Sequence, residues 1–149
     1  EFSRIMSLKD GLKKMSKSEI SDLSRINLTD DKDTIANKIK KAKTDALPLP
    51  SKIEELEKRP EVKNLIGIYS SLAGLTLEDS INEFSGKNFS LFKENLSQLL
   101  IEKIIPISFE IKKLLNDHNY LDSILIDGYK KADKIASKKV EKIHEIIGF

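Results

Sequence analysis

The chain has 149 residues, of which 39% are apolar and 34% are charged, and its net charge is +2. This balance is typical of one globular domain with charged helix faces, and it excludes a disordered chain and a chain that is basic throughout. The absence of cysteine excludes disulfides and thiolate chemistry, and no apolar run reaches membrane-spanning length. Since the start of the chain does not resemble a signal peptide, we expect a cytoplasmic protein without a membrane partner.

The first residues predict a short strand that needs a partner. Residues 5–8 form a brief apolar run, which is typical of an inner strand of a sheet. No partner strand is evident nearby in the sequence, and one strand alone is not stable. The chain also begins without an initiator methionine. We therefore expect it to be part of a longer protein.

Residues 10–22, DGLKKMSKSEISD, are expected to form a mobile loop rich in lysine and serine. Sites that bind phosphate use backbone donors, hydroxyl groups and lysine ammonium groups. The segment supplies all three kinds of group: its backbone offers N–H donors, and its side chains offer hydroxyl and ammonium groups at Lys14, Ser16, Lys17 and Ser18. Composition alone leaves two interpretations open, a loop that holds phosphates and a solvated basic loop.

Beyond this loop, the spacing of apolar residues predicts helices. The first is expected to be capped by Thr29 or Asp30 and to end in a cluster of lysines within residues 38–43. Two prolines within residues 47–50 exclude a continuing helix and predict an extended connector. A short helix is expected over residues 51–58.

The next two helices are marked by their end residues. Pro60 is expected in the first turn of one helix, and Gly74 is placed to end it. Thr76 is expected to cap the following helix, with Asp79 as its capping-box partner, and Gly86 closes it.

A long helix opened by Asn88 or Ser90 is apolar on nearly all sides, so we expect it to be central. Pro106 should kink or break it. The last helix is predicted from about residue 120 to 147, weakened at Gly128 and stopped at Gly148. The sum is five or six antiparallel helices joined by short loops, after a non-helical segment of about thirty residues.

The last helix carries a basic surface. Its apolar residues form one stripe, and lysines lie opposite at spacings of three and four residues, at Lys131, Lys134, Lys138 and Lys142. Such a row can meet an RNA backbone, although a solvated helix face is the alternative for each lysine. His118 and His144 have no ligand-like partners in the sequence, so no metal site is predicted.

The string Lys14-Met15-Ser16-Lys17-Ser18 matches the KMSKS signature of class I aminoacyl-tRNA synthetases without a mismatch. The strings RIMSL before it, SRINLTDD after it, RPEVKNLIGIY and GYKKA resemble the tryptophanyl branch of that family more than the tyrosyl branch. The resemblance covers essentially the whole chain and includes its C-terminus. One departure is Glu19, where relatives usually have Asp followed by Pro.

The resemblance implies a mainly α fold. Residues 30–149 would form an antiparallel helical bundle of the anticodon-binding type. Residues 1–29 would be a short strand and loop segment from the end of a Rossmann-like catalytic domain. The chain would then be the C-terminal part of an enzyme, and we expect a homodimer for the longer protein.

The family's reaction joins tryptophan to ATP, with release of pyrophosphate, and then passes the tryptophanyl group to tRNA(Trp). By resemblance, Lys14 and Lys17 stabilise charge on the pyrophosphate leaving group. The substrate Mg-ATP would be contacted by Ile5, through its backbone near adenine, and by Lys14, Met15, Ser16, Lys17 and Ser18. The tRNA contacts would include Lys131, Lys134 and Lys138.

The family's other signature, HIGH, is absent from this chain. We therefore expect that the chain by itself does not form the adenylate and binds no cofactor on its own. The alternative is a stand-alone, non-catalytic helical module that binds RNA or protein and retains the loop as a relic.

Overall fold

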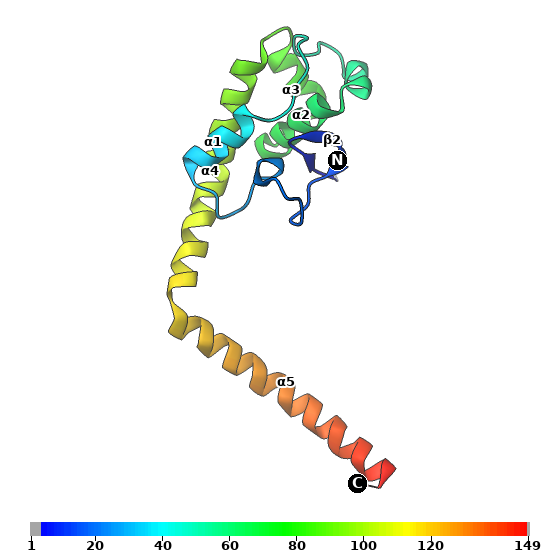
Figure 1. Ribbon diagram of the computed structural model, residues 1–149, viewed down its shortest axis with the longest axis vertical. Helices are drawn as coiled ribbons and strands as arrows, with labels where there is room; N and C mark the ends of the chain where they lie inside the picture. The colour runs from blue at the N-terminus through cyan, green and yellow to red at the C-terminus, as the bar shows by residue number, and fades with distance from the viewer. Residues whose placement is uncertain (1–3, 149) are drawn as a thin grey trace. The chain divides into compact units, whose positions relative to one another are not determined.

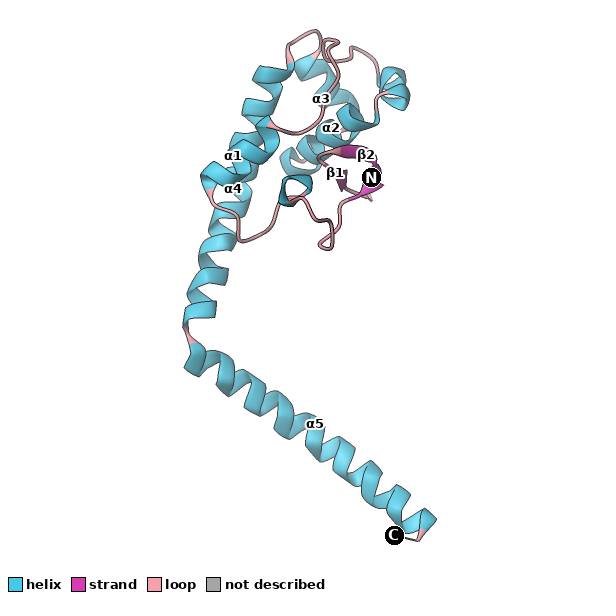
Figure 2. Ribbon diagram, in the orientation of Figure 1, coloured by secondary structure: helices cyan, strands magenta, loops and turns pink. Residues whose placement is uncertain are grey.

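The computed structural model describes residues 4–148, in which helices account for most of the structure and the strands form one small sheet (Figures 1 and 2). Its elements in chain order are β1 (Met6–Ser7), β2 (Asp10–Lys14), η1 (Asp22–Ser24), α1 (Lys32–Lys40), η2 (Ile53–Lys58), α2 (Pro60–Ala73), α3 (Leu77–Phe84), α4 (Phe89–Asn116) and α5 (His118–Ile147). The predicted mainly α fold class is confirmed. Across residues 4–148, no helix combines the length and apolar character needed to cross a bilayer.

The chain divides into two compact units, Glu1–Phe109 and Glu110–Phe149. The first unit holds the sheet, α1, α2, α3 and most of α4. The second holds the end of α4 and all of α5. The predicted boundary between residues 29 and 30 concerns the domains of the longer protein, and it stays a prediction.

The partner of the first strand is the segment that follows it directly. β1 pairs antiparallel with β2, with Met6 opposite Lys14 and Ser7 opposite Asp10. The hydroxyl of Ser7 accepts the N–H of Lys9 at 3.2 Å, which stabilises the tight turn between the strands. The expectation of a loop over all of residues 10–22 is therefore wrong for its first part, and so is the view that the first strand lacks a nearby partner.

α2, and not α4, is the central helix of the first unit. Its buried residues lie on several sides and include Val62, Leu65, Ile66 and Ile68. α4 instead buries a single row at four-residue spacing, made by Phe92, Leu96, Leu100, Ile104 and Ser108. Fully burying one such aliphatic or aromatic side chain contributes roughly 1.5–3 kcal/mol.

Most helix ends follow the predicted signals. α2 begins at Pro60 and ends at Gly74, whose φ of 70° suits glycine. The hydroxyl of Thr76 accepts the N–H of Asp79 at 3.1 Å, as predicted for the cap of α3. α1 differs, because its N-cap is Asp31, which accepts the N–H of Thr34 at 2.8 Å.

Among the described residues, the break considered at Pro106 is absent, and α5 is continuous, as expected for a helix that is only weakened at Gly128. α4 continues through Pro106 to Asn116, and α5 continues through Gly128. A proline removes only one backbone hydrogen bond, here to the carbonyl of Glu102, and both residues are exposed so that water can bind this carbonyl. The remaining hydrogen bonds on either side maintain each helix.

Candidate functional site

The KMSKS string begins on a strand and ends on an exposed turn. Lys14 is the last residue of β2. The backbone N–H of Met15 donates to the carbonyl of Ile5 at 3.1 Å, which closes the hairpin, and the half-buried Met15 side chain packs against the apolar core. The carbonyl of Ile5, one of the groups expected near adenine, is thus engaged within the hairpin.

The polar side chains of the string point into solvent. Lys14, Ser16, Lys17 and Ser18 are all exposed. The two serine hydroxyls lie 2.9 Å apart, and Ser16 also accepts the N–H of Ser18 at 3.3 Å. These contacts hold the turn compact. The turn therefore presents two hydroxyl groups and the ammonium group of Lys17 close together on the surface.

The hairpin below the turn is fixed to α2 (Figure 2). The side-chain amide of Asn64, which is 2% exposed, donates to the carbonyl of Met6 and accepts its N–H, both at 2.8 Å. On β2, a Cβ added to Gly11 would lie 2.5 Å from the backbone nitrogen of Glu61. The glycine is therefore required by the close approach of β2 to the start of α2.

The segment that leaves the turn is held by α1. The Lys38 ammonium lies 2.7 Å from Oδ2 of Asp22 and 2.7 Å from Oδ2 of Asp30. The hydrogen bond from Lys38, followed by that from Asn27, lowers the pKa of the Asp22 carboxyl below its usual range. Asp30 also accepts the N–H of Asn27 at 2.9 Å, so it organises the turn before α1 and does not cap the helix.

Sequence reasoning missed the role of Lys38. The side chain was assigned to the basic end of a helix, yet it is 2% exposed. Its position three residues after Ile35 and next to Ile39, which are both fully buried, was the available signal. A lysine on the apolar side of an amphipathic helix needs a buried carboxylate partner.

The structure places the predicted ATP residues Ile5, Lys14, Met15, Ser16, Lys17 and Ser18 on one hairpin of the first unit and on the exposed turn that follows it. The predicted tRNA residues Lys131, Lys134 and Lys138 all lie on α5, in the second unit.

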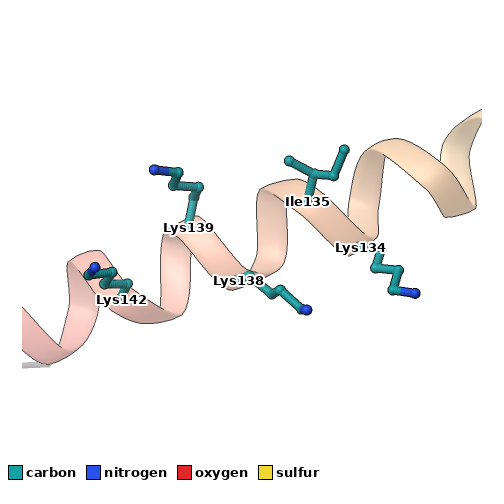
Figure 3. A pocket seen from close by; sticks show the side chains of 5 residues that line it. All are labelled: Lys134, Ile135, Lys138, Lys139 and Lys142. Carbon is teal, nitrogen blue, oxygen red and sulfur yellow. The ribbon is translucent and has the colours of Figure 1, made fainter.

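A basic surface lies along α5 (Figure 3). One shallow hollow is lined by Lys134, Ile135, Lys138, Lys139 and Lys142. In Figure 3, Lys134 and Lys138 project on one side of the helix, whereas Ile135 and Lys139 project on the other. Lys131 is exposed on the same helix but does not line the hollow. Because one helix supplies all these residues, the surface suits an extended polyanion better than a small enclosed ligand.

A second hollow, of about 850 Å³, lies between α1 and the first half of α4. Its lysine on α4, Lys93, donates to the carbonyl of Ala42 at 2.7 Å and of Lys40 at 3.3 Å. Burial lowers the pKa of this lysine. Its ammonium group therefore caps the carbonyl end of α1. Within residues 4–148, no group of three or more His, Asp and Glu side chains is arranged to hold a metal ion.

Comparison with known proteins identifies the family of the chain. The family described as "tRNA synthetases class I (W and Y)" matches residues 2–105. The tryptophan–tRNA ligase of Mesorhizobium japonicum is 51% identical over 146 residues, which cover 98% of this chain and 41% of that protein. That of Rickettsia felis is 51% identical over 147 residues, which cover 99% of this chain and 44% of the relative.

Two solved structures share the fold. Tryptophanyl-tRNA synthetase from Campylobacter jejuni aligns with a TM-score of 0.75 at 25% identity, over 99% of this chain and 44% of that one. The Mycoplasma pneumoniae enzyme aligns with a TM-score of 0.68 at 24% identity, over 98% of this chain and 45% of that one, which supports the fold alone.

The chain belongs to the class I tRNA synthetase family that acts on tryptophan and tyrosine. Within that family, its curated relatives named above are tryptophan–tRNA ligases, and the chain spans less than half of their length. The expected resemblance to the tryptophanyl branch is confirmed.

Proposed function

We propose that the chain is the C-terminal part of a tryptophan–tRNA ligase, in which it supplies the loop that handles the ATP phosphates and a helical surface for tRNA(Trp). The observation that carries this proposal is the intact KMSKS string on an exposed turn, in a chain 51% identical to a tryptophan–tRNA ligase over 98% of its length. The alternative, a non-catalytic module, would retain the string only as a relic, and it offers no reason for all five residues to be intact.

The exposed ammonium groups suit the chemistry of adenylate formation. Attack of the tryptophan carboxylate on the α-phosphorus of ATP breaks the bond to pyrophosphate, and negative charge accumulates on that leaving group. Lys14 and Lys17 would stabilise this charge, because phosphoryl chemistry depends on positioning and positive charge more than on a general base. Mg²⁺ would arrive with the nucleotide as part of the substrate.

The serine residues and the methionine would have supporting roles. Ser16 and Ser18 would donate hydroxyl hydrogen bonds to phosphate oxygens, in exchange for the contact that they now make with each other. Met15 would hold the base of the turn against the core, where it already packs. Ile5 would offer backbone groups near adenine. The turn would close over ATP and reopen after release of pyrophosphate.

The second half of α5 would contact the phosphate backbone of tRNA(Trp) through Lys131, Lys134 and Lys138, with Lys139 and Lys142 beside them. All five lysines are exposed. We also propose that the longer protein is a cytoplasmic homodimer, as the tryptophanyl family resemblance implies.

ATP–pyrophosphate exchange in the full-length protein tests the catalytic part. We expect Lys17→Ala to slow tryptophan-dependent exchange by roughly 100-fold, the order of a lost charge-stabilising group. Its thermal unfolding midpoint should be unchanged, because Lys17 is exposed. The matched control is Lys63→Ala on the exposed side of α2. Exchange at the normal rate by the Lys17 variant would show that the phosphate role is wrong.

A further inference from the structure

The ammonium group of Lys38 contacts two carboxylates, although one would be enough to compensate the charge of a buried lysine. Its side chain is 2% exposed, and that of Asp30 is 9% exposed. An ammonium group out of water is stabilised by one well-placed carboxylate with further hydrogen bonds. Asp22 adds a second carboxylate at the same distance, although its own side chain is 54% exposed. This second contact links α1 to a segment outside the core.

The contact continues from Asp22 toward the turn. Oδ1 of Asp22 lies 2.9 Å from Nη2 of Arg25, and Nη1 of Arg25 donates to the backbone carbonyl of Glu19 at 2.8 Å. Glu19 follows Ser18 directly. A continuous series of charged hydrogen bonds therefore leads from the buried Lys38 to the residue next to the KMSKS string. Such bonds are shorter and stronger than neutral ones.

The two ends of the turn are thus fixed to different helices. Before the turn, Asn64 on α2 holds Met6, and the Met15 N–H closes the hairpin on Ile5. After the turn, Lys38 on α1 acts through Asp22 and Arg25. The exposed residues between them, Ser16 to Ser18, span a short segment whose end points are both defined.

We propose that Lys38 and Asp22 are positioning residues for the KMSKS turn, and that their ion pair sets where the Lys17 ammonium group can reach. In this role neither residue would touch substrate. They hold the end of the turn, so that Lys17 meets the ATP phosphates without a further search through loop conformations. This inference rests on the proposed function. It adds a connection between the first helix of the predicted tRNA-binding part and the ATP turn.

The test uses Asp22→Asn in the full-length protein. The neutral amide weakens the pair with Lys38, and its NH₂ group cannot accept a hydrogen bond from Arg25. We expect kcat for tryptophan-dependent ATP–pyrophosphate exchange to fall about tenfold, since small misplacements of catalytic groups have effects of this order or greater. The thermal midpoint should stay close to that of the parent, because Asp22 is about half exposed.

Asp33→Asn is the matched control, because it removes the same charge from an exposed residue in the first turn of α1. Its kcat should remain within about twofold of the parent value, as for a surface substitution away from the site. An Asp22→Asn enzyme that matches the Asp33→Asn enzyme would overturn the proposal.

A double variant separates positioning from a general loss of folded enzyme. If Asp22 acts through Lys17, Asp22→Asn should have almost no further effect on kcat in the Lys17→Ala background. A smaller folded fraction would instead lower kcat by the same factor in both backgrounds, and that result would refute the positioning role.

The two proposals fail in different ways. Normal exchange by Lys17→Ala alone would refute the proposed phosphate role. Slow exchange by Lys17→Ala, together with normal exchange by Asp22→Asn, would refute the positioning role and leave the phosphate role standing.

Discussion

The side-chain amide of Asn64 satisfies both main-chain polar groups of Met6, through two hydrogen bonds of 2.8 Å between residues 58 positions apart. A neighbouring strand would make the same pair of bonds. β1 thus has β2 on one side and a helix side chain on the other. This arrangement stabilises a two-stranded sheet that would be marginal by itself.

Replacement of this amide should be costly. Asn64→Ala leaves the N–H and carbonyl of Met6 without their partner in a partly buried position. We expect the free energy of unfolding of the chain to fall by about 2–4 kcal/mol, because each unsatisfied group costs roughly 1–3 kcal/mol. Urea denaturation followed by circular dichroism measures this change. Asn95→Ala, an exposed substitution in α4, should change it by less than about 0.5 kcal/mol.

Two glycine-to-alanine substitutions should have opposite effects. In Gly11→Ala the new Cβ would meet backbone atoms of Pro60 and Glu61 at 2.5 Å, which a side-chain movement cannot relieve. We expect a loss of about 1–3 kcal/mol, as for overpacking. At Gly128, inside α5, a Cβ meets nothing within 4 Å, so alanine should stabilise the helix by up to about 1 kcal/mol. Thermal unfolding tests both predictions: the midpoint should fall for Gly11→Ala and rise for Gly128→Ala.

The bidentate ion pair between Asp45 and Arg59 should make stability depend on acid pH. Hydrogen bonds from Arg59, at 2.7 and 2.6 Å, lower the pKa of the Asp45 carboxyl. The unfolded chain therefore binds this proton more readily than the folded chain, and the stabilisation is full above the ordinary Asp pKa of about 3.9. It is lost as the pH falls through the lower pKa of the folded state.

Asp45→Asn should consequently lower the free energy of unfolding by about 1 kcal/mol at pH 7, the upper range for a partly exposed pair. The difference from the parent chain should shrink as the pH is lowered from about 4 toward 2. Denaturant titrations at several pH values measure it. Asp127→Asn, an exposed substitution in α5, is the control. A difference for Asp45→Asn that is independent of pH would contradict the assignment.

The basic surface of α5 predicts salt-dependent tRNA binding. Lys134→Ala with Lys138→Ala removes two charges from one side of the helix, as seen in Figure 3. We expect weaker binding of tRNA(Trp) and a decrease of about 1.4–1.8 in the magnitude of the slope of log K against log salt concentration, because each lysine–phosphate contact contributes about 0.7–0.9. Fluorescence anisotropy between low and moderate salt measures both quantities.

The control for that experiment is Lys58→Ala with Lys63→Ala, which removes the same charge from exposed positions at η2 and α2. This variant should keep the salt slope of the parent chain. Equal slopes for both double variants would assign the binding to overall charge, and the surface on α5 would lose its special role.

Local chemistry made much of the fold predictable. Pro60, Gly74 and Thr76 start or end a helix through contacts with residues close to them in sequence. The end of α2 and the starts of α2 and α3 follow from them. Pro106 misled as a signal for a break, because the bonded turns on either side of it outweigh its cost of about 3 kcal/mol to the helix. The cap of α1 was misplaced by one residue because a better partner for Asp30 lies eight positions away.

The candidate site was predictable to the extent that its residues are adjacent in sequence. The KMSKS string is continuous, so the proximity of its residues at the end of β2 and on the following turn required no long-range information. The supports of that hairpin come from Asn64 and Lys38, which are separated in sequence from the groups they hold. The apolar neighbours of Lys38 indicate its burial, but the partners of both residues depend on how α1 and α2 pack beside the strands, which the local sequence does not show.

The shared ammonium group of Lys38 also restricts how this part of the chain can evolve. A change at this position leaves two carboxylates without their common counter-charge at once, and Asp30 is too buried to be hydrated instead. We therefore expect a single substitution there to be destabilising even where either carboxylate alone would be replaceable. We expect positions 22, 30 and 38 to vary together among homologues, with apolar or amide side chains appearing at all three in the same lineages.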